Sequence, residues 1–531
     1  MKFLTQPFPF QFRRGPIVSL VFLVFGGLAA YETATYIVSG DFVGLAYVGI
    51  VVAMGTMVVF ILLDWRKGLY LFLAWLLFED LSRKFLGNNM AIYFAKDIFV
   101  GVVYLAFFIA YRSSRKEENK PFRFPFRAAL LVFVWFGIIQ VFNPASSHIA
   151  YGILGAKLYF YYMPLLLIGY YLINSETDLR RFFYVNLSLM LVIVILGLVQ
   201  SVAGPRFLNP TVMADDIRLL SETYRVAPVS GIRVYRPTSV FVSAGRFGDM
   251  LIVAWMLVFG FGGYLLLKHR RGRIFAFLAL ALIAAGCLMC ASRGVFMWSL
   301  ASTIVGSVAF IWGAPWRQGE ALRVVRTLQR AFLGVALAVV ILSFVYPEAF
   351  LGRLAVYSET LDPRSSANEL VHRGRDYPLK NFLAAFDYPR WPYGYGIGAI
   401  SLGGQYVSRF FNVRPVVGSV ESGFGCIVIE MGIGGLTLWL VMSVTLLVHA
   451  WKVVRGLKGS PWFPLGFMIF WYAAVLLLPL TFSSMTSYQD FIMNAYMWLL
   501  LGILFRLPKL AHSASLQPSF PPQQARGPWA R

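Results

Sequence analysis

The chain has little charge for its 531 residues, since only 13% of them are charged, whereas a soluble domain carries about 25%. Apolar residues make up 59% of the chain, and the mean hydropathy is +0.68. They gather in runs of about 17–25 residues, the helix length that crosses about 30 Å of hydrocarbon. This composition excludes a soluble globular domain. The chain also lacks the alternating ten-residue segments of a membrane β-barrel.

Cysteine is rare, and the three cysteines, Cys287, Cys290 and Cys426, all lie in apolar runs. We interpret them as small core residues, because their placement suggests neither a disulfide framework nor a metal site. The CxxC spacing of Cys287 and Cys290 is attributed to chance. An Asp-rich metal motif is also absent, so the sequence predicts no metal and no cofactor.

Acidic residues are scarce, with 24 Asp and Glu against 47 Lys and Arg, which gives a net charge of +23. The basic residues are scattered over many short loops, a distribution that argues against a nucleic-acid partner. Lys and Arg concentrate in the cytoplasmic loops of membrane proteins. We therefore attribute most of the charge to membrane topology, with the lipid bilayer as the surroundings of the chain.

About fourteen apolar runs predict membrane-spanning helices. They cover about 16–38, 42–63, 68–80, 91–111, 128–143, 150–173, 182–203, 245–267, 274–290, 295–313, 331–347, 421–450, 462–480 and 490–505. With the N-terminus inside, nearly every basic cluster falls on the cytoplasmic side. The sequence thus predicts an all-α polytopic membrane protein with about 12–14 transmembrane helices and with both termini cytoplasmic. The third run is short.

Two long loops fall on the extracytoplasmic side, and their wealth of Tyr, Trp, Phe and Arg predicts that both are ordered. The predicted parts are an N-terminal transmembrane bundle (1–203), a first extracytoplasmic loop (204–244), central transmembrane helices (245–347), a large extracytoplasmic loop (348–420), C-terminal transmembrane helices (421–510) and a disordered cytoplasmic tail (511–531).

Arginines on the predicted extracytoplasmic side are contrary to the positive-inside rule, so they need another explanation. Arg233, Arg236 and Arg246 lie in or beside the first loop, and Arg293 lies in a turn between two spans where Gly294 permits the reversal. Arginine offers a fork of donors to phosphate oxygens, and a charge bounded by apolar runs must pair or meet an anion. Two explanations stay open, namely snorkelling to lipid phosphates and a dedicated anion site.

The second loop contains a predicted amphipathic helix. From Pro378 onward, Leu379, Phe382, Leu383 and Phe386 follow the i, i+3, i+4, i+7 pattern of one helix face. We expect this face to lie on the membrane surface.

Basic residues precede this helix and glycines follow it. His372, Arg373 and Arg375 come before it, and the sequence GYGIG at 394–398 comes after it. Alternating glycines let a backbone approach a ligand closely. Without a βαβ unit they are no dinucleotide fingerprint.

Three charged residues lie within or at the start of predicted spans, where they are candidates for function. Lys157 either pairs with a carboxylate in the bundle or faces the same anion as the arginines. Glu430 precedes the glycines at 432–435, which favour close helix packing, so its role is either structural or functional. Glu421 begins a span, where it is either a carboxylate favoured by the helix dipole or a general base.

Several motifs between about 230 and 435 resemble those of the O-antigen ligase and O-antigen polymerase superfamily, bacterial membrane glycosyltransferases of the GT-C type. One is the Ser-Arg-Gly turn at 292–294. Another is Arg375 ahead of an amphipathic helix that leads to Pro389 and a Gly-x-Gly run. A third is Glu-x-Gly-x-x-Gly from Glu430, and YRPTSVFVSAGRFGDML is similar to the family's pre-span loop. Ligases have a His about nine residues before that Glu, whereas this chain has Glu421, which favours a polymerase.

The resemblance implies an enzyme of the bacterial inner membrane that uses a polyprenyl-diphosphate-linked oligosaccharide as donor, without a metal. The acceptor would be a growing glycan or an acceptor glycolipid, and a chain-length regulator would be a further partner. The implied residues are Glu421 as the catalytic base, Arg293, Arg375, Arg236, Arg233 and Lys157 at the diphosphate, and His372, Arg373, Trp391, Tyr393 and Tyr395 at the glycan.

Three functions stay open at this point. The first is a polymerase of lipid-linked repeat units, and the second is a ligase that transfers glycan to a lipid or protein acceptor. The third is a lipid-linked glycan flippase, which would be expected to show repeated halves. No such symmetry is found in the sequence.

Overall fold

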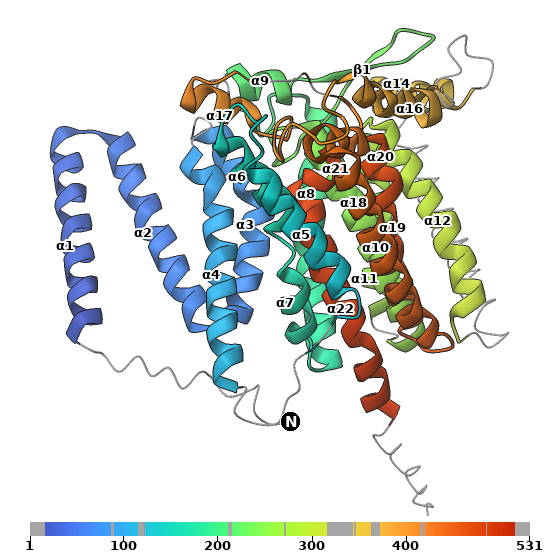
Figure 1. Cartoon of the computed structure of the whole chain (residues 1–531), viewed down its shortest axis with the longest axis horizontal. Coiled ribbons are helices and arrows are strands. Elements are labelled where there is room, and N and C mark those ends of the chain that lie inside the picture. The colour runs from blue at the N-terminus through green and yellow to red at the C-terminus, as the bar shows by residue number, and fades with distance from the viewer. Residues whose placement is uncertain are drawn as a thin grey trace, which may run out of the picture. The chain divides into compact units, whose positions relative to one another are not determined.

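The computed structural model describes residues 16–86, 90–114, 122, 124–210, 215–269, 272–315, 344, 347–362, 372–414, 418, 420–484 and 486–515 (Figure 1). Two compact units divide the chain. Unit 1 comprises Met1–Phe122, Asn209–Arg218 and Val240–Val242. Unit 2 comprises Arg123–Leu208, Leu219–Ser239 and Ser243–Arg531.

The described residues are mostly helical, with very little strand. Unit 1 contains α1 (Pro16–Ser39), α2 (Phe42–Leu63), α3 (Trp65–Phe85) and α4 (Met90–Ser114), and α9 (Asp215–Ser221) runs from unit 1 into unit 2. The long helices of unit 2 are α5 (Arg127–Val141), α6 (Ile149–Phe160), α7 (Leu165–Leu172), α8 (Glu176–Ala203), α10 (Ala244–Lys268), α11 (Gly272–Met289), α12 (Arg293–Gly313), α18 (Gly423–Gly456), α19 (Phe463–Val475) and α22 (Phe491–Ser515).

Short elements complete unit 2. They are the antiparallel strands β1 (Tyr224–Val226) and β2 (Arg233–Tyr235), the helices α14 (Pro347–Leu361), α16 (Tyr377–Leu383), α17 (Gly404–Phe411), α20 (Thr481–Ser483) and α21 (Thr486–Gln489), the π-helical turns η1 (His372–Asp376) and η3 (Leu476–Leu480), and the 3₁₀ turn η2 (Ala384–Asp387).

Nine helical segments among the described residues are long and apolar enough to cross a membrane. The chain is therefore an all-α polytopic membrane protein, as its hydropathy predicts. Each predicted span coincides with a helix, except 331–347, which lies almost entirely outside the described residues. The predicted disordered tail begins too early, because α22 continues to Ser515; residues 516–531 lie outside the description.

The third predicted span, 68–80, is corrected by the structure. Helix α3 has 21 residues and continues through four charged side chains that hydropathy treats as the end of a span. These charges are buried and paired inside unit 1: Lys96 contacts Glu79 at 2.9 Å, and Arg83 contacts Asp80 at 2.8 Å. Buried charge is tolerated in a membrane helix when such partners are present.

Helix α10 lies at the centre of unit 2, where it packs against α8, α11, α12, α19 and α22. Helix α22 also packs closely along α7, and glycines make this approach possible. A side chain at Gly169 would overlap the carbonyl oxygen of Leu499, and one at Gly502 would overlap that of Leu166. Small residues at such crossings are typical of packed membrane helices.

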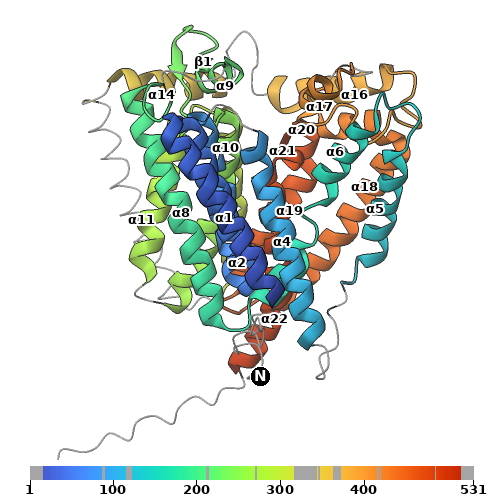
Figure 2. The same cartoon turned by 90° about the vertical axis from the view of Figure 1, so that its left-hand side faces the viewer.

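One end of unit 2 carries the strands β1 and β2 and the short helices α14, α16 and α17, and we call it the loop face (Figures 1 and 2). It therefore holds the described residues of both long loops that belong to unit 2, as expected for two loops that share one side. The described residues of the first loop include a β-hairpin that the sequence did not predict. Figure 2 shows β1 and α14 on one side of this face and α16 and α17 on the other.

Candidate functional site

Glu421 lies on the loop face, two residues before α18, and side chains of α16 hold it. The Tyr377 hydroxyl donates a hydrogen bond to Glu421 Oε2. The backbone N–H of Glu421 donates to Asn381 Oδ1 at 3.2 Å. Tyr377 and Asn381 stand at i and i+4, so they project from one face of α16. The carboxylate is exposed and accepts a hydrogen bond, as a base at a surface site would.

Helix α16 begins where the amphipathic pattern predicts, but only part of its apolar side faces outward. Phe382 packs against Phe482, with ring centroids 5.8 Å apart, and Phe386 packs against Trp391 at 5.3 Å. Leu379 and Leu383 are exposed. Tyr377 and Asn381 were not identified from the sequence. Their i, i+4 spacing gains meaning only because the fold brings α16 to the start of α18, beside Glu421.

The predicted glycan-contacting residues are placed differently from one another. Tyr393 is 78% exposed, whereas Tyr395 is only 8% exposed and packs beside Tyr388. Burial leaves the Tyr395 ring without an open face for a sugar, so we correct its assignment to packing. His372 is exposed, 6.0 Å from Tyr377 between ring centroids. The side chain of Arg373 lies outside the described residues.

Arg375 lies in η1, just before α16, with its side chain 74% exposed. Its Nε atom donates to Asp376 Oδ1 at 2.8 Å. It thus belongs to the Glu421 side of the loop face, but it is solvated and paired with its neighbour in sequence.

The glycine-rich segment after α16 packs into the bundle. Helix α18 is interrupted at Gly432, which has a φ of 70°, and residues 391–401 occupy the interruption. Tyr395 N–H donates to Ile429 O at 2.8 Å, and Ile433 N–H donates to Trp391 O at 3.1 Å. These bonds satisfy backbone groups that a broken membrane helix would otherwise leave free. We call residues 391–401 the docking segment.

Glu430 holds the other end of the docking segment. Its Oε1 atom accepts hydrogen bonds from Ser401 Oγ at 2.7 Å and from Ile400 N–H at 3.2 Å. Gln489 extends the network, donating to Ser401 Oγ at 3.0 Å. Of the two roles left open for Glu430, the contacts favour the structural one. The glycines likewise bring the segment close to helices of the same chain.

Gly398→Ala is expected to destabilise the protein, because a methyl group there would overlap the Tyr151 carbonyl oxygen at a φ of 91°. Gly404→Ala is the matched control, since its methyl group would lie 3.5 Å from the Tyr151 ring, an ordinary contact distance, at a backbone φ that is not left-handed. The melting temperature of the purified protein in detergent should fall for the first variant and stay near wild type for the second. Equal melting temperatures would contradict the close docking.

Arg236 lies on the opposite side of the loop face from α16, directly after β2. Hydrogen bonds hold the backbone of the residues that follow it. Gln200 Oε1 accepts from Thr238 N–H at 2.8 Å and from Ser239 N–H at 2.6 Å. Arg236 Nε is buried and has no hydrogen-bond partner among the described residues. Burial lowers the pKa of Arg236, and interactions with Cys290, Tyr357 and Asp249 only partly oppose this.

Further charges lie near Arg236. The Arg246 guanidinium stands 4.6 Å from the centre of the Phe491 ring. Asp249 interacts electrostatically with Asp490, Arg246 and Arg236. Asp490 Oδ1 in turn accepts from the first backbone N–H groups of α22, at 2.9 and 3.0 Å. The group therefore combines two arginines with two carboxylates, and we call it the arginine group.

The chain between α19 and α22 connects the arginine group to Glu421. Its first part contacts the start of α18, where Ser422 Oγ donates to Phe482 O at 2.8 Å. Its last residue is Asp490, beside Phe491 and Arg246. Residues 481–490, broken into α20 and α21, thus join the two sides of the loop face.

Arg293 and Arg233 belong to the hairpin side. Arg293 Nη2 donates to Val226 O at 3.3 Å, and the Arg233 guanidinium lies 5.5 Å from the Tyr224 ring. Gly294 does not make the reversal predicted for it, since it lies within α12. The positive φ in this turn belongs to Ala291, at 50°.

The hairpin is capped by α14. Glu359 Oε2 accepts from Val229 N–H at 2.8 Å and from Ser230 N–H at 3.1 Å. Hydrogen bonds from Ser230 and Val229 hold the pKa of Glu359 below its usual value, aided by nearby Arg293. Arg293 therefore already has protein partners in this structure.

The arginines that the resemblance assigns to the diphosphate are therefore not gathered at one point. Arg293 lies with β1, and Arg375 adjoins α16 on the other side of the loop face (Figure 2). Arg236 is connected to the Glu421 side by the chain itself, because Asp490 near Arg236 and residues 481–484 near Glu421 belong to the same segment between α19 and α22. Lys157 lies in the last turn of α6, within a span, as predicted.

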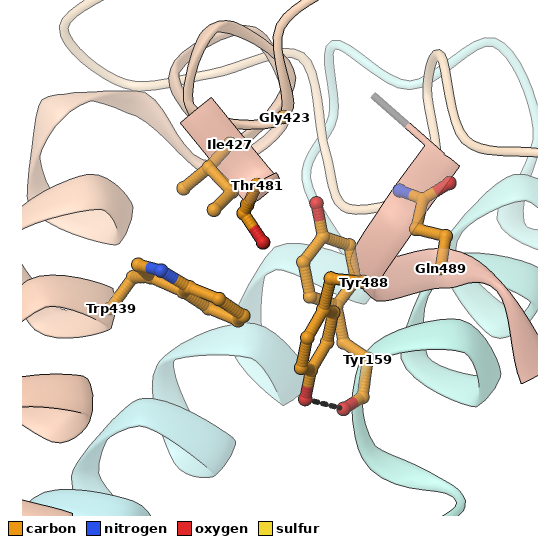
Figure 3. Close-up of a pocket in the computed structure, with 7 residues that line it drawn as sticks. All are labelled: Tyr159, Gly423, Ile427, Trp439, Thr481, Tyr488 and Gln489. Atoms are coloured by element: carbon orange, nitrogen blue, oxygen red, sulfur yellow. Dashed lines mark hydrogen bonds between the residues drawn. The ribbon is translucent and has the colours of Figure 1, made fainter. Parts of the chain in front are cut away.

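A small cavity lies beneath the first turn of α18 (Figure 3). The rings of Tyr159, Trp439 and Tyr488 line it together with Gly423, Ile427, Thr481 and Gln489, and the Tyr488 hydroxyl donates to Tyr159 O at 2.9 Å. Its volume of about 10 Å³ suits about one water molecule. A cavity of this volume does not admit a sugar.

A search of the described residues for metal-binding clusters and comparisons of the chain with family models and curated proteins gave negative results. Within the described part of the chain, no three His, Cys, Asp or Glu side chains gather as a metal site would require. No protein-family model and no curated protein matches the chain.

Proposed function

We propose that the chain is a membrane glycosyltransferase that polymerises polyprenyl-diphosphate-linked oligosaccharide repeat units on the extracytoplasmic face of a bacterial inner membrane. The observation that carries this proposal is the position of Glu421 at the start of a membrane helix, where its carboxylate accepts from the Tyr377 hydroxyl and its backbone N–H donates to Asn381. The motif resemblance between about 230 and 435 supplies the substrate class.

The proposed reaction is a displacement at the anomeric carbon of the donor sugar. Glu421 accepts the proton of an acceptor hydroxyl, the hydroxyl oxygen bonds to the anomeric carbon, and the bond from that carbon to the diphosphate oxygen breaks. A positioned base of this kind contributes about 10²–10⁴-fold to a rate. The electron pair leaves with the polyprenyl diphosphate.

Arg236 is the arginine best suited to the leaving diphosphate. A buried guanidinium is stabilised by an anion that restores the interactions lost from water, and burial already lowers the pKa of Arg236. Its buried Nε donor has no hydrogen-bond partner among the described residues. Donors fixed before reaction stabilise charge that develops in the transition state.

The charge distribution of unit 2 supports an extracytoplasmic loop face. The ends of α10 and α18 away from this face carry Lys268 and Arg455 in their final turns. Basic residues concentrate on the cytoplasmic side. The loop face would then meet the leaflet where lipid-linked glycans are polymerised.

A lipid-linked glycan flippase is the second candidate. Broken helices are typical of transporters, and interruptions of this kind occur at Gly432 in α18 and at η3, which contains Pro479. Both interruptions here are occupied or continued by packed segments of the same chain. A ligase would use the same chemistry with a different acceptor.

Tyr377→Phe tests the positioning of Glu421. Loss of a hydrogen bond to a charged group costs about 1.5 kcal/mol, so polymer formation should slow about tenfold at unchanged protein level. In a Glu421→Gln background the same change should have little further effect, because the two residues act together. Independent, multiplicative losses would remove Tyr377 from the proposed site.

A further inference from the structure

Helix α17 is a short amphipathic helix whose two faces are cleanly divided. In GQYVSRFF, helical spacing of 100° per residue puts Tyr406, Val407, Phe410 and Phe411 on one side. Gln405, Ser408 and Arg409 take the other side. Left-handed residues bound the helix, Gly403 before it and Asn412 after it, with φ values of 85° and 51°.

The helix lies across the N-terminal end of α6, which begins a membrane span. Phe411 stacks on His148, the N-cap of α6, with ring centroids 4.5 Å apart. Tyr151 hydroxyl donates to Val413 O at 3.3 Å. These contacts fix α17 at the level where the span of α6 starts.

The apolar side of α17 is open, in continuation of an open apolar strip on α6. Phe410 is 84% exposed, and Phe411 is exposed beside it. On α6, Ile149 and Ile153 stand at i and i+4, and both are exposed. Because α6 belongs to a membrane span, its outward apolar side chains face lipid.

We propose that α17 lies in the boundary layer of the phospholipid leaflet at the loop face, with Phe410 and Phe411 inserted among the upper acyl chains. The continuity with the lipid-facing strip of α6 favours lipid over a protein partner. Amphipathic helices in this layer bury their apolar side about 5–10 Å into the headgroup and acyl boundary. Arg409 on the polar side, and the exposed Arg414 that follows, suit the phosphate groups at that depth.

This inference does not depend on the proposed enzyme activity. It states where one surface of the chain meets its surroundings, and lipid contact is measured without a substrate. The sequence pattern predicts an interfacial helix at 378–386 and not at α17, where Phe410 and Phe411 are exposed.

Spin labelling tests the proposal. Phe410→Cys and Gln405→Cys are each labelled with a nitroxide and reconstituted in vesicles of phosphatidylethanolamine and phosphatidylglycerol. The three native cysteines are buried, and labelling of the wild-type chain measures their background. Collision rates with oxygen, which concentrates in the acyl layer, and with a water-soluble nickel chelate are then compared.

The label at 410 should collide more with oxygen than with the nickel chelate, and the label at 405 should show the reverse. More frequent nickel collisions at 410 would overturn the proposal, because the side chain would face water. Shielding of 410 from both reagents would also overturn it, because a partner or a second copy would then cover the face. Phe411→Cys repeats the measurement should label at 410 disturb the helix.

Discussion

Glu421→Gln should stop the formation of long polysaccharide while lipid-linked repeat units accumulate. The amide keeps the size of the side chain and its place beside Tyr377 but cannot accept the acceptor proton at neutral pH. A loss of about 10²–10⁴-fold in the polymerisation rate is expected. Gel electrophoresis of cell-surface glycan and chromatography of extracted lipid-linked intermediates measure both quantities.

Asp387→Asn is the matched control for this variant. Asp387 is an exposed carboxylate at the end of η2, and it makes no hydrogen bond to other described residues. Its amide should leave chain length unchanged. Normal polymer from Glu421→Gln at wild-type protein level would contradict the assignment of the base.

Arg353→Met should lower the free energy of unfolding by about 2–3 kcal/mol, because buried carbonyl groups would lose their donor. Arg353 is 4% exposed. Its guanidinium donates to Met289 O at 2.8 Å, Tyr235 O at 3.1 Å and Ser201 O at 3.4 Å. Two of these carbonyls end the helices α11 and α8, whose last turns lack internal partners.

Thermal or denaturant unfolding in detergent measures this effect. Arg390→Met is the control, since Arg390 is exposed and its side chain makes no hydrogen bond within the described residues. Arg353→Lys should restore part of the stability, because an ammonium keeps the charge but cannot span three carbonyls in one plane. Unfolding of Arg353→Met at the wild-type midpoint would refute its bridging role.

The membrane-spanning part of the fold was predictable because hydrocarbon imposes length and hydropathy on each helix. The predicted spans match helices, and α16 begins at the predicted Pro378 turn. Helix α3 did not follow this rule, because Arg83 pairs with Asp80 one turn away in the same helix and Glu79 pairs with Lys96 on α4, a contact that no local pattern reveals.

The candidate site was less predictable, because it depends on contacts between distant parts of the chain. Glu421 stood out as a charge at the start of a span, whereas Tyr377 lies 44 residues before it in sequence. Arg353 looks like one more basic residue of an amphipathic helix until the ends of α8 and α11 meet around it. Gln200 gave a weak signal, as a polar residue inside an apolar run, and it fixes the segment next to Arg236.

The glycine-rich docking segment shows that one sequence pattern is compatible with two structures, a ligand site and a close internal contact. Alternating glycines indicate that a backbone comes close to something. In this chain the neighbours are the interruption of α18 and the turn of α6 around Tyr151, so the close approach is internal. Only the three-dimensional arrangement distinguishes this from a ligand site.

Reconstitution of the purified chain in vesicles with a polyprenyl-diphosphate-linked oligosaccharide tests the central claim most directly. The proposed function predicts a ladder of glycans longer by whole repeat units, with release of polyprenyl diphosphate, and no ladder from Glu421→Gln. Glycan that crosses the bilayer with its length unchanged would contradict the account and identify a transporter instead.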